Sequence, residues 1–181
     1  MSFNRKLLAA TAAVALALPA AVMAEEQTAQ SEITGEIVGA CTISATNIDF
    51  GQKSAAEVGN VFTQQSAITV NCSQNLPYKV YAEISPSVEM RAPAAQGGGT
   101  STETKPVTQN SIALGEKGTV ALFSDSNATA AFPHDVSSAL VRNGTGSPET
   151  IDVYAKWTMP ATISNGSFGR YKVSVANKIV F

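Results

Sequence analysis

Cysteine, histidine and aspartate are the side chains of this sequence with the widest chemical range, and they are few. The chain holds Cys41, Cys72 and a single histidine, His134, which is followed by Asp135. A redox-active pair of cysteines usually has Cys-x-x-Cys spacing, and a structural zinc site needs four nitrogen or sulfur ligands. The two cysteines fit neither pattern, so we predict no metal site and no bound cofactor.

A hydrolase is the other chemistry to weigh, because His134 and Asp135 stand near several serines. The sequence has no Gly-x-Ser-x-Gly turn, and His134 follows a proline in a polar segment. Only a base and a nucleophile brought together in the folded chain would be evidence for a catalytic triad. We therefore expect an exposed loop histidine with no catalytic residues around it, and we predict that the protein is not an enzyme.

The N-terminal residues have the pattern of a secretory signal peptide. Arg5 and Lys6 precede the apolar run Leu7–Val22, and the small residue Ala24 stands just before two glutamates. The run is short for a membrane anchor, which is the alternative. We predict that residues 1–24 are a signal peptide, removed when the chain is exported.

Export also decides the state of the two cysteines. An exported chain meets an oxidising compartment, where two cysteines form one intramolecular bridge by default. We predict a disulfide between Cys41 and Cys72. In chain-entropy models, closing a loop of this length contributes roughly 3–4 kcal/mol to stability.

The charge of the mature chain argues against nucleic acid as a partner. Without the signal peptide, which carries two of the 12 basic residues, the chain has 10 basic and 14 acidic residues and a net charge of −4. Non-specific affinity for a phosphate backbone depends on clustered lysine and arginine, and this sequence contains no such cluster.

The hydrophobic pattern has period two along most of the mature chain, which predicts an all-β protein. Apolar side chains alternate with polar ones over Ser66–Asn71, Tyr78–Ile84, Gly118–Asp125 and Ile151–Met159. We expect about seven to nine short strands, punctuated by glycine, proline and asparagine, in a β-sandwich with Trp157 in or over its core. Residues 85–109 lack this alternation and are predicted to be a long loop or flexible excursion, with one edge strand around Val88–Met90.

The two ends of the mature chain carry amphipathic strands whose partners are not apparent. In Ser31–Ala40, Ile33 and Ile37 share one face with Gly35 between them. In Gly169–Phe181, one face carries five apolar residues: Tyr171, Val173, Val175, Ile179 and Phe181. The first stretch is either the first strand of its own sandwich or a strand for another chain, since an incomplete sandwich exposes an edge that invites one.

The order of several short motifs resembles the pilin subunits of the chaperone–usher pathway, and most closely the spore coat U-like family, also called archaic or Csu-type pilins. The motifs are Gly35-Glu36-Ile37 before Cys41, Asn47-Ile48-Asp49-Phe50-Gly51, Ile68-Thr69-Val70-Asn71-Cys72-Ser73, Pro77-Tyr78-Lys79-Val80, Val120–Asp125 and the ending Gly169-Arg170-Tyr171 through Phe181. The sequence departs from the family at Val173, where an acidic residue is often found, and in a long insertion at Ala92–Thr108.

The resemblance implies an incomplete immunoglobulin-like β-sandwich, residues 41–181, that is completed by a donor strand from another copy or from a related pilin subunit. Residues 25–40 would be the donor extension, with Ile33, Gly35 and Ile37 facing the acceptor. Tyr171, Val173, Val175, Ile179 and Phe181 would border the acceptor groove and be recognised by a periplasmic chaperone.

The resemblance also implies a function. The protein would be a structural subunit that is exported through the periplasm and an outer-membrane usher into a surface fimbrium for adhesion or biofilm formation. The alternative is a self-contained secreted β-sandwich that binds a ligand such as a carbohydrate through Trp157 or Tyr154.

Overall fold

The computed structural model describes residues 30–181, so the predicted signal peptide, residues 1–24, lies outside the described residues. Residues 37–181 form one compact unit, and residues 30–36 belong to a second one. Within the described residues, the fold is all-β, with ten strands, four short 3-10 turns and no α-helix. This confirms the predicted fold class, although the number of strands exceeds the seven to nine expected from the sequence.

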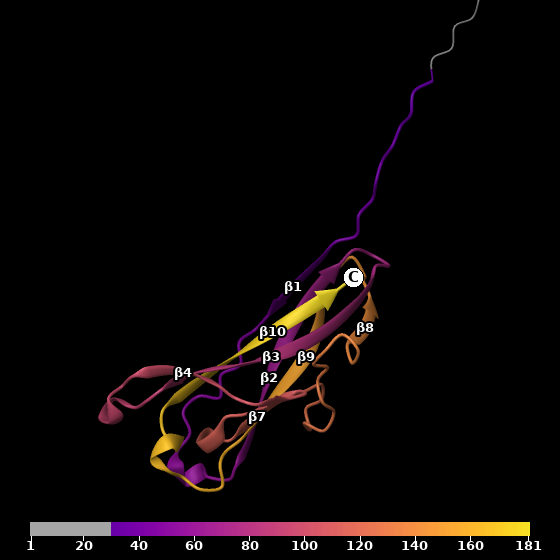
Figure 1. Ribbon diagram of the computed structural model, residues 1–181. Helices are drawn as coiled ribbons and strands as arrows, with labels where there is room; N and C mark the ends of the chain where they lie inside the picture. Colours follow the sequence, from indigo (N-terminus) through magenta and orange to yellow (C-terminus); the bar gives the residue numbers. More distant parts are fainter. Residues whose placement is uncertain (1–29) are drawn as a thin grey trace, which may run out of the picture. The chain divides into compact units, whose positions relative to one another are not determined.

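Two antiparallel sheets pack face to face as a sandwich (Figure 1). The larger sheet has, in spatial order, β1 (Cys41–Ala45), β2 (Val61–Cys72), β9 (Glu149–Thr158), β7 (Thr119–Phe123), β6 (Ser111–Ala113) and β5 (Val107–Thr108). The smaller sheet has β10 (Arg170–Val180), β3 (Pro77–Arg91) and β4 (Thr100–Thr104), and β8 (Leu140–Asn143) pairs with the first residues of β3. The short turns are η1 (Ala55–Glu57), η2 (Ala94–Gln96), η3 (Gly115–Lys117) and η4 (Asn165–Ser167).

The core lies between the sheets and follows the predicted alternation. On β2 the side chains of Ile68, Val70 and Cys72 are buried, whereas those between them are not. The same period holds on β9, from Ile151 to the buried Trp157. Because side chains alternate between the two faces of a strand, a period of two is enough to place one face in the core.

The prediction of a long loop over residues 85–109 is wrong, but the strand expected around Val88–Met90 is present as part of β3, paired on both sides rather than at an edge. Strand β3 continues through Pro86 to Arg91, and β4 and β5 follow it. Proline is tolerated in a strand where the ladder is irregular, and the pairing of β10 with β3 shifts register here, between Val173 and Val175. The carbonyl of Pro86 accepts a hydrogen bond of 2.7 Å from the Lys105 N–H.

The disulfide between Cys41 and Cys72 is present, as predicted. The two residues are direct partners in the ladder that joins β1 to β2. The bridge therefore fixes the first residue of β1 to the last residue of β2, at one end of the larger sheet.

We predict that the disulfide carries a large share of the stability. Replacing both residues, Cys41→Ser with Cys72→Ser, should lower the free energy of unfolding by about 3 kcal/mol, because the unfolded chain regains the entropy of the open loop. Urea unfolding with and without reductant measures this difference. The double variant should respond identically in both conditions, and an unchanged midpoint for the reduced natural protein would contradict the prediction.

Candidate functional site

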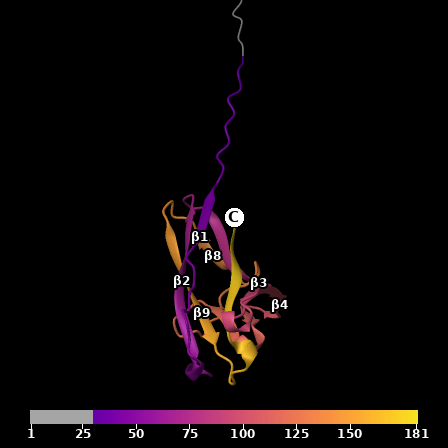
Figure 2. The same cartoon turned by 90° about the vertical axis from the view of Figure 1, so that its left-hand side faces the viewer.

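Strands β1 and β10 each pair on one side only. In the described part of the chain, β1 pairs with β2 and β10 pairs with β3, and neither has a second ladder partner. The two strands nevertheless approach one another, one at the edge of each sheet (Figures 1 and 2). A strip of unpaired backbone N–H and C=O groups therefore faces the space between two neighbouring edges, which is the arrangement that accepts an added strand.

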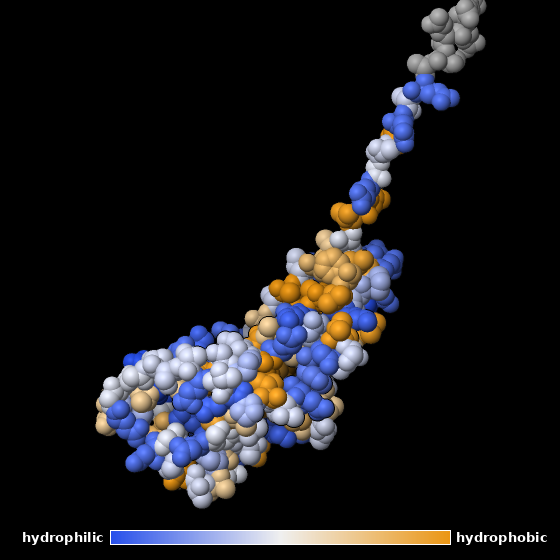
Figure 3. All heavy atoms as spheres, viewed as in Figure 1, coloured by the Kyte–Doolittle hydropathy of each residue, from blue (hydrophilic) through white to orange (hydrophobic). Residues whose placement is uncertain are grey.

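The core-facing side chains of these edges are incompletely covered. We call this set the β1/β10 seam; it consists of Cys41, Ile43, Tyr171, Val173, Val175 and Ile179, all half-buried and packed against the core. By contrast, the core-facing residues of β2 from Ser66 to Cys72 and of β9 from Ile151 to Trp157 are buried. Hydrophobic side chains gather on the face over β1 and β10 in the space-filling view (Figure 3). The seam is thus the place where this core lacks a layer of side chains.

A cleft of about 900 Å³ opens beside the start of β10. Its wall includes three aromatic rings: the ring of Trp157 lies 5.7 Å from Phe50 and 5.3 Å from Tyr171, between ring centroids. The ring of Phe62, which packs against the core, lies 5.9 Å from that of Trp157. The indole N–H of Trp157 donates a 2.8 Å hydrogen bond to the Lys117 carbonyl. Trp157 is thus held in the core by its neighbours and is not presented on the surface as a sugar-stacking platform.

Tyr171 brings a polar atom to this cleft. Its hydroxyl is buried and has no hydrogen-bond partner in the described residues. Burial, and secondarily the negative charge of Asp49, raises the pKa of Tyr171 above its usual value, so the hydroxyl stays protonated. A buried hydroxyl that lacks a partner is costly, and an acceptor brought by another chain would relieve that cost.

Lys117 fixes the loop that leads into β10. Its side chain is 8% exposed, and its ammonium group donates to the carbonyls of Gly166, at 2.7 Å, and of Phe168. Burial lowers the pKa of Lys117. Nothing in the sequence marked this lysine as buried, because a lysine in a Gly-Glu-Lys-Gly turn is usually exposed.

Residues 31–40 show none of the strand structure that their alternation predicts. They form no strand and pair with none in the described residues, and the side chains of Ile33 and Ile37 are 97% and 102% exposed. These residues are therefore not the first strand of their own sandwich, which was one of the two possibilities left by the sequence.

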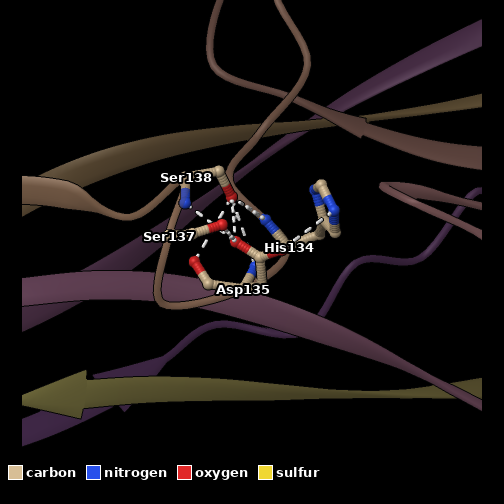
Figure 4. Close-up of polar contacts among 4 residues, drawn as sticks. All are labelled: His134, Asp135, Ser137 and Ser138. Atoms are coloured by element: carbon tan, nitrogen blue, oxygen red, sulfur yellow. Dashed lines mark hydrogen bonds and ion pairs between the residues drawn. The ribbon is translucent and has the colours of Figure 1, made fainter.

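The residues around His134 form a capped turn rather than a catalytic triad (Figure 4). Asp135 accepts hydrogen bonds from the hydroxyls of Ser137, at 2.7 Å, and Ser138, at 2.9 Å, and its other oxygen lies 3.4 Å from Nε2 of His134. The carboxylate thus lies between the serines and the imidazole. The backbone N–H of His134 donates to the Ser138 hydroxyl, at 3.2 Å, but no hydrogen bond joins the imidazole to either hydroxyl. A nucleophilic serine needs the base beside it, so this order cannot activate one.

One expectation about chemistry is adjusted by the structure. His134 lies in a loop, as predicted, but its side chain is half-buried rather than exposed. In residues 30–181, no three side chains of histidine, cysteine, aspartate or glutamate are grouped so as to hold a metal ion. Nor does any helix in this part of the chain have the length and apolar character needed to span a membrane.

The described residues thus form an all-β sandwich with two adjacent unpaired edges and a disulfide at one end of β1, which defines the fold class of the protein. A comparison with protein families adds the particular assignment: residues 27–175 match the Spore Coat Protein U domain, and the chain belongs to that family. Its domain is found in fimbrial subunits of the chaperone–usher pathway and is structural rather than enzymatic. A search of curated protein sequences found no match.

We predict that Asp135 stabilises its loop through its charge. Hydrogen bonds from Ser137 and Ser138 hold the pKa of Asp135 well below its usual range. A depressed pKa contributes stability that is present above the unfolded value of about 4 and is lost as the pH falls below it. The Asp135→Asn variant should therefore have a lower urea midpoint of unfolding than the natural protein at pH 7. The difference between the two midpoints should narrow at pH 2.5. A gap of equal size at both pH values would contradict this.

Proposed function

We propose that this protein is a structural fimbrial subunit that polymerises by donor-strand complementation. The observation that carries the proposal is the β1/β10 seam, where two unpaired sheet edges flank core residues that are only half-buried. A strand added between β1 and β10 would pair with both edges and cover the seam. Main-chain hydrogen bonds supply affinity in this mode of recognition, and alternate side chains supply specificity.

The proposed donor is the segment around Ile33, Gly35 and Ile37 of another copy. Both isoleucines are fully exposed in the single chain, and the residues between Ser31 and Gly39 make no ladder of their own. On an extended strand, Ile33, Gly35 and Ile37 point to one face. That face would enter the seam, with Gly35 allowing the backbones to approach closely.

The topology sets the direction in which the donor runs. Cys41 pairs with Cys72, and Lys79, just beyond the turn that follows, pairs with Val180, so β1 starts at the end of the sandwich where β10 finishes (Figure 2). The donor segment therefore leaves each copy at that end. A linear fibre needs each copy to receive a strand from the opposite end, which makes the donor antiparallel to β10.

The remaining partners follow from the same open edge. An edge that is unpaired before polymerisation is an aggregation hazard, so it needs cover during export. We propose that a periplasmic chaperone covers the seam, that an outer-membrane usher receives the subunit, and that the fibre is displayed on the cell surface. Phe181, 59% exposed beyond the end of β10, is available for recognition by the chaperone.

Deleting the donor segment tests the function. Removal of residues 25–38 should abolish polymers while leaving the acceptor sandwich intact, because the deletion ends before β1. The measurement is denaturing electrophoresis of cell-surface material from cells that also produce the assembly machinery. The natural protein should give a ladder that collapses to one band on boiling, as expected for a kinetically stable, non-covalent polymer. A ladder from the deletion variant, or a lone monomer band from the natural protein, would overturn the proposal.

Point variants separate the two faces of the donor. Ile37→Asn should remove most of the ladder, because it places an amide where the seam needs an apolar side chain. Thr34→Ser is a matched control on the opposite face of the same segment and should leave the ladder unchanged. Equal effects of the two substitutions would contradict the proposed orientation.

A further inference from the structure

Three basic residues gather at the end of the seam where a donor strand would enter. We call Arg91, Arg170 and Lys172 the basic patch. All three are exposed, line the cleft of about 900 Å³ and lie on the outward face of β3 and β10. In the ladder, Arg170 stands directly opposite Arg91, and Lys172 stands opposite Glu89. Like charges directly opposite one another destabilise a sheet, so Arg91 and Arg170 do not compensate each other, and of the three only Lys172 has an acidic residue across the ladder.

None of the three makes an ion pair within the described residues. The ion pairs found there are Lys105 with Glu103, His134 with Asp135, and Lys178 with Glu83. The cleft is lined by five basic residues against two acidic ones, although the whole chain has a net charge of −2. A local positive excess on an acidic protein is an arrangement that attracts an acidic partner.

The proposed donor segment has the complementary charge. Residues 30–40 contain Glu32 and Glu36 and no lysine or arginine. If Ile33 and Ile37 face the seam, both glutamates face outward, on the same side of the sheet as Arg170 and Lys172. Along β10 this outward face is Arg170, Lys172, Ser174, Ala176, Lys178 and Val180, with no acidic residue.

One antiparallel register joins these charges and also fills the cleft. With Glu36 opposite Lys172, Glu36 lies diagonally from Arg170. The same register sets Ile37 beside Tyr171 at the cleft, and Ile33 beside Val175 in the seam. Because residues directly opposite in antiparallel strands share a face, no other register brings both Glu36 onto Lys172 and Ile37 to Tyr171.

We propose that Glu36 of an incoming copy pairs with Lys172 and Arg170 of the receiving copy, and that this pairing sets the register of the donated strand. The inference rests on the proposed function, since it needs a second copy in the seam. Exposed cross-strand ion pairs contribute little to final stability, so the effect falls on the rate and the register of strand addition.

A charge swap in the full-length chain tests the pairing. Glu36→Lys and Lys172→Glu alone should each slow ladder formation by about three- to tenfold at low salt, and the two together should restore it. Lys79→Glu, the same change on the outward face of β3 at the far end, is the matched control and should have no effect. The differences should shrink at 0.5 M salt, where screening is strong.

Cross-linking tests the register independently of rates. Glu36→Cys with Lys172→Cys should give a ladder that survives boiling without reductant, because directly opposed residues lie within reach of a disulfide. Glu36→Cys with Ser174→Cys, one register step away, should give a ladder that collapses on boiling.

The outcomes distinguish this inference from the function on which it rests. If the natural protein forms ladders, Ile37→Asn abolishes them and no charge change affects them, the proposed pairing alone is overturned. Retention of the natural protein on a heparin column, lost with Lys172→Glu while ladders persist, would assign the patch to a polyanion and also overturn it. Absence of any ladder from the natural protein would overturn the function itself.

Discussion

The structure depends on a sandwich core that its own chain leaves partly open. The backbone polar groups and core side chains of a stable β-sandwich need neighbours. In the described residues, β1 and β10 each have a neighbouring strand on one side only. Where β2 and β9 are covered by strands on both sides, their core residues are buried; along the β1/β10 seam they are half-buried. Under the proposed function, the open seam turns an ordinary need for core packing into a need for another polypeptide.

Both ends of the seam are tied to the rest of the sandwich. At one end the disulfide joins Cys41 to Cys72 and so fixes β1 to its sheet. At the other end Trp157 contacts Phe50, which follows β1, and Tyr171, which begins β10. Lys117 holds the Trp157 indole through its carbonyl and the loop before β10 through its ammonium group. Burying an ammonium group costs free energy, so its position here indicates that holding this cleft in place matters to the structure.

The sequence predicted those strands whose own residues alternate between apolar and polar. Strands β2, β9 and β10 alternate in hydrophobicity because one face is in the core, and the disulfide followed from cysteine count and compartment. Strand β4 was missed because all five of its residues are exposed and polar, so only its pairing with β3 defines it. Pro86 hid the continuity of β3, since a proline within a strand is acceptable only at an irregularity that pairing creates.

The site was harder to predict than the fold, for a related reason. Ile33 and Ile37 alternate like strand residues, yet no strand forms there in the single chain, because strand structure requires a partner edge. The alternation of apolar and polar residues thus predicts that a segment can form a strand, but not which chain provides the neighbouring strand.

An unpaired apolar strand is also prone to aggregate in solution, and Glu32 and Glu36 limit aggregation by placing a charge next to each isoleucine. In the proposed pairing, the same charges distinguish one receiving edge from other exposed edges, since β10 presents Arg170 and Lys172 where β4 presents threonines and Glu103. Protection from wrong partners and selection of the right one are then two effects of the same two side chains.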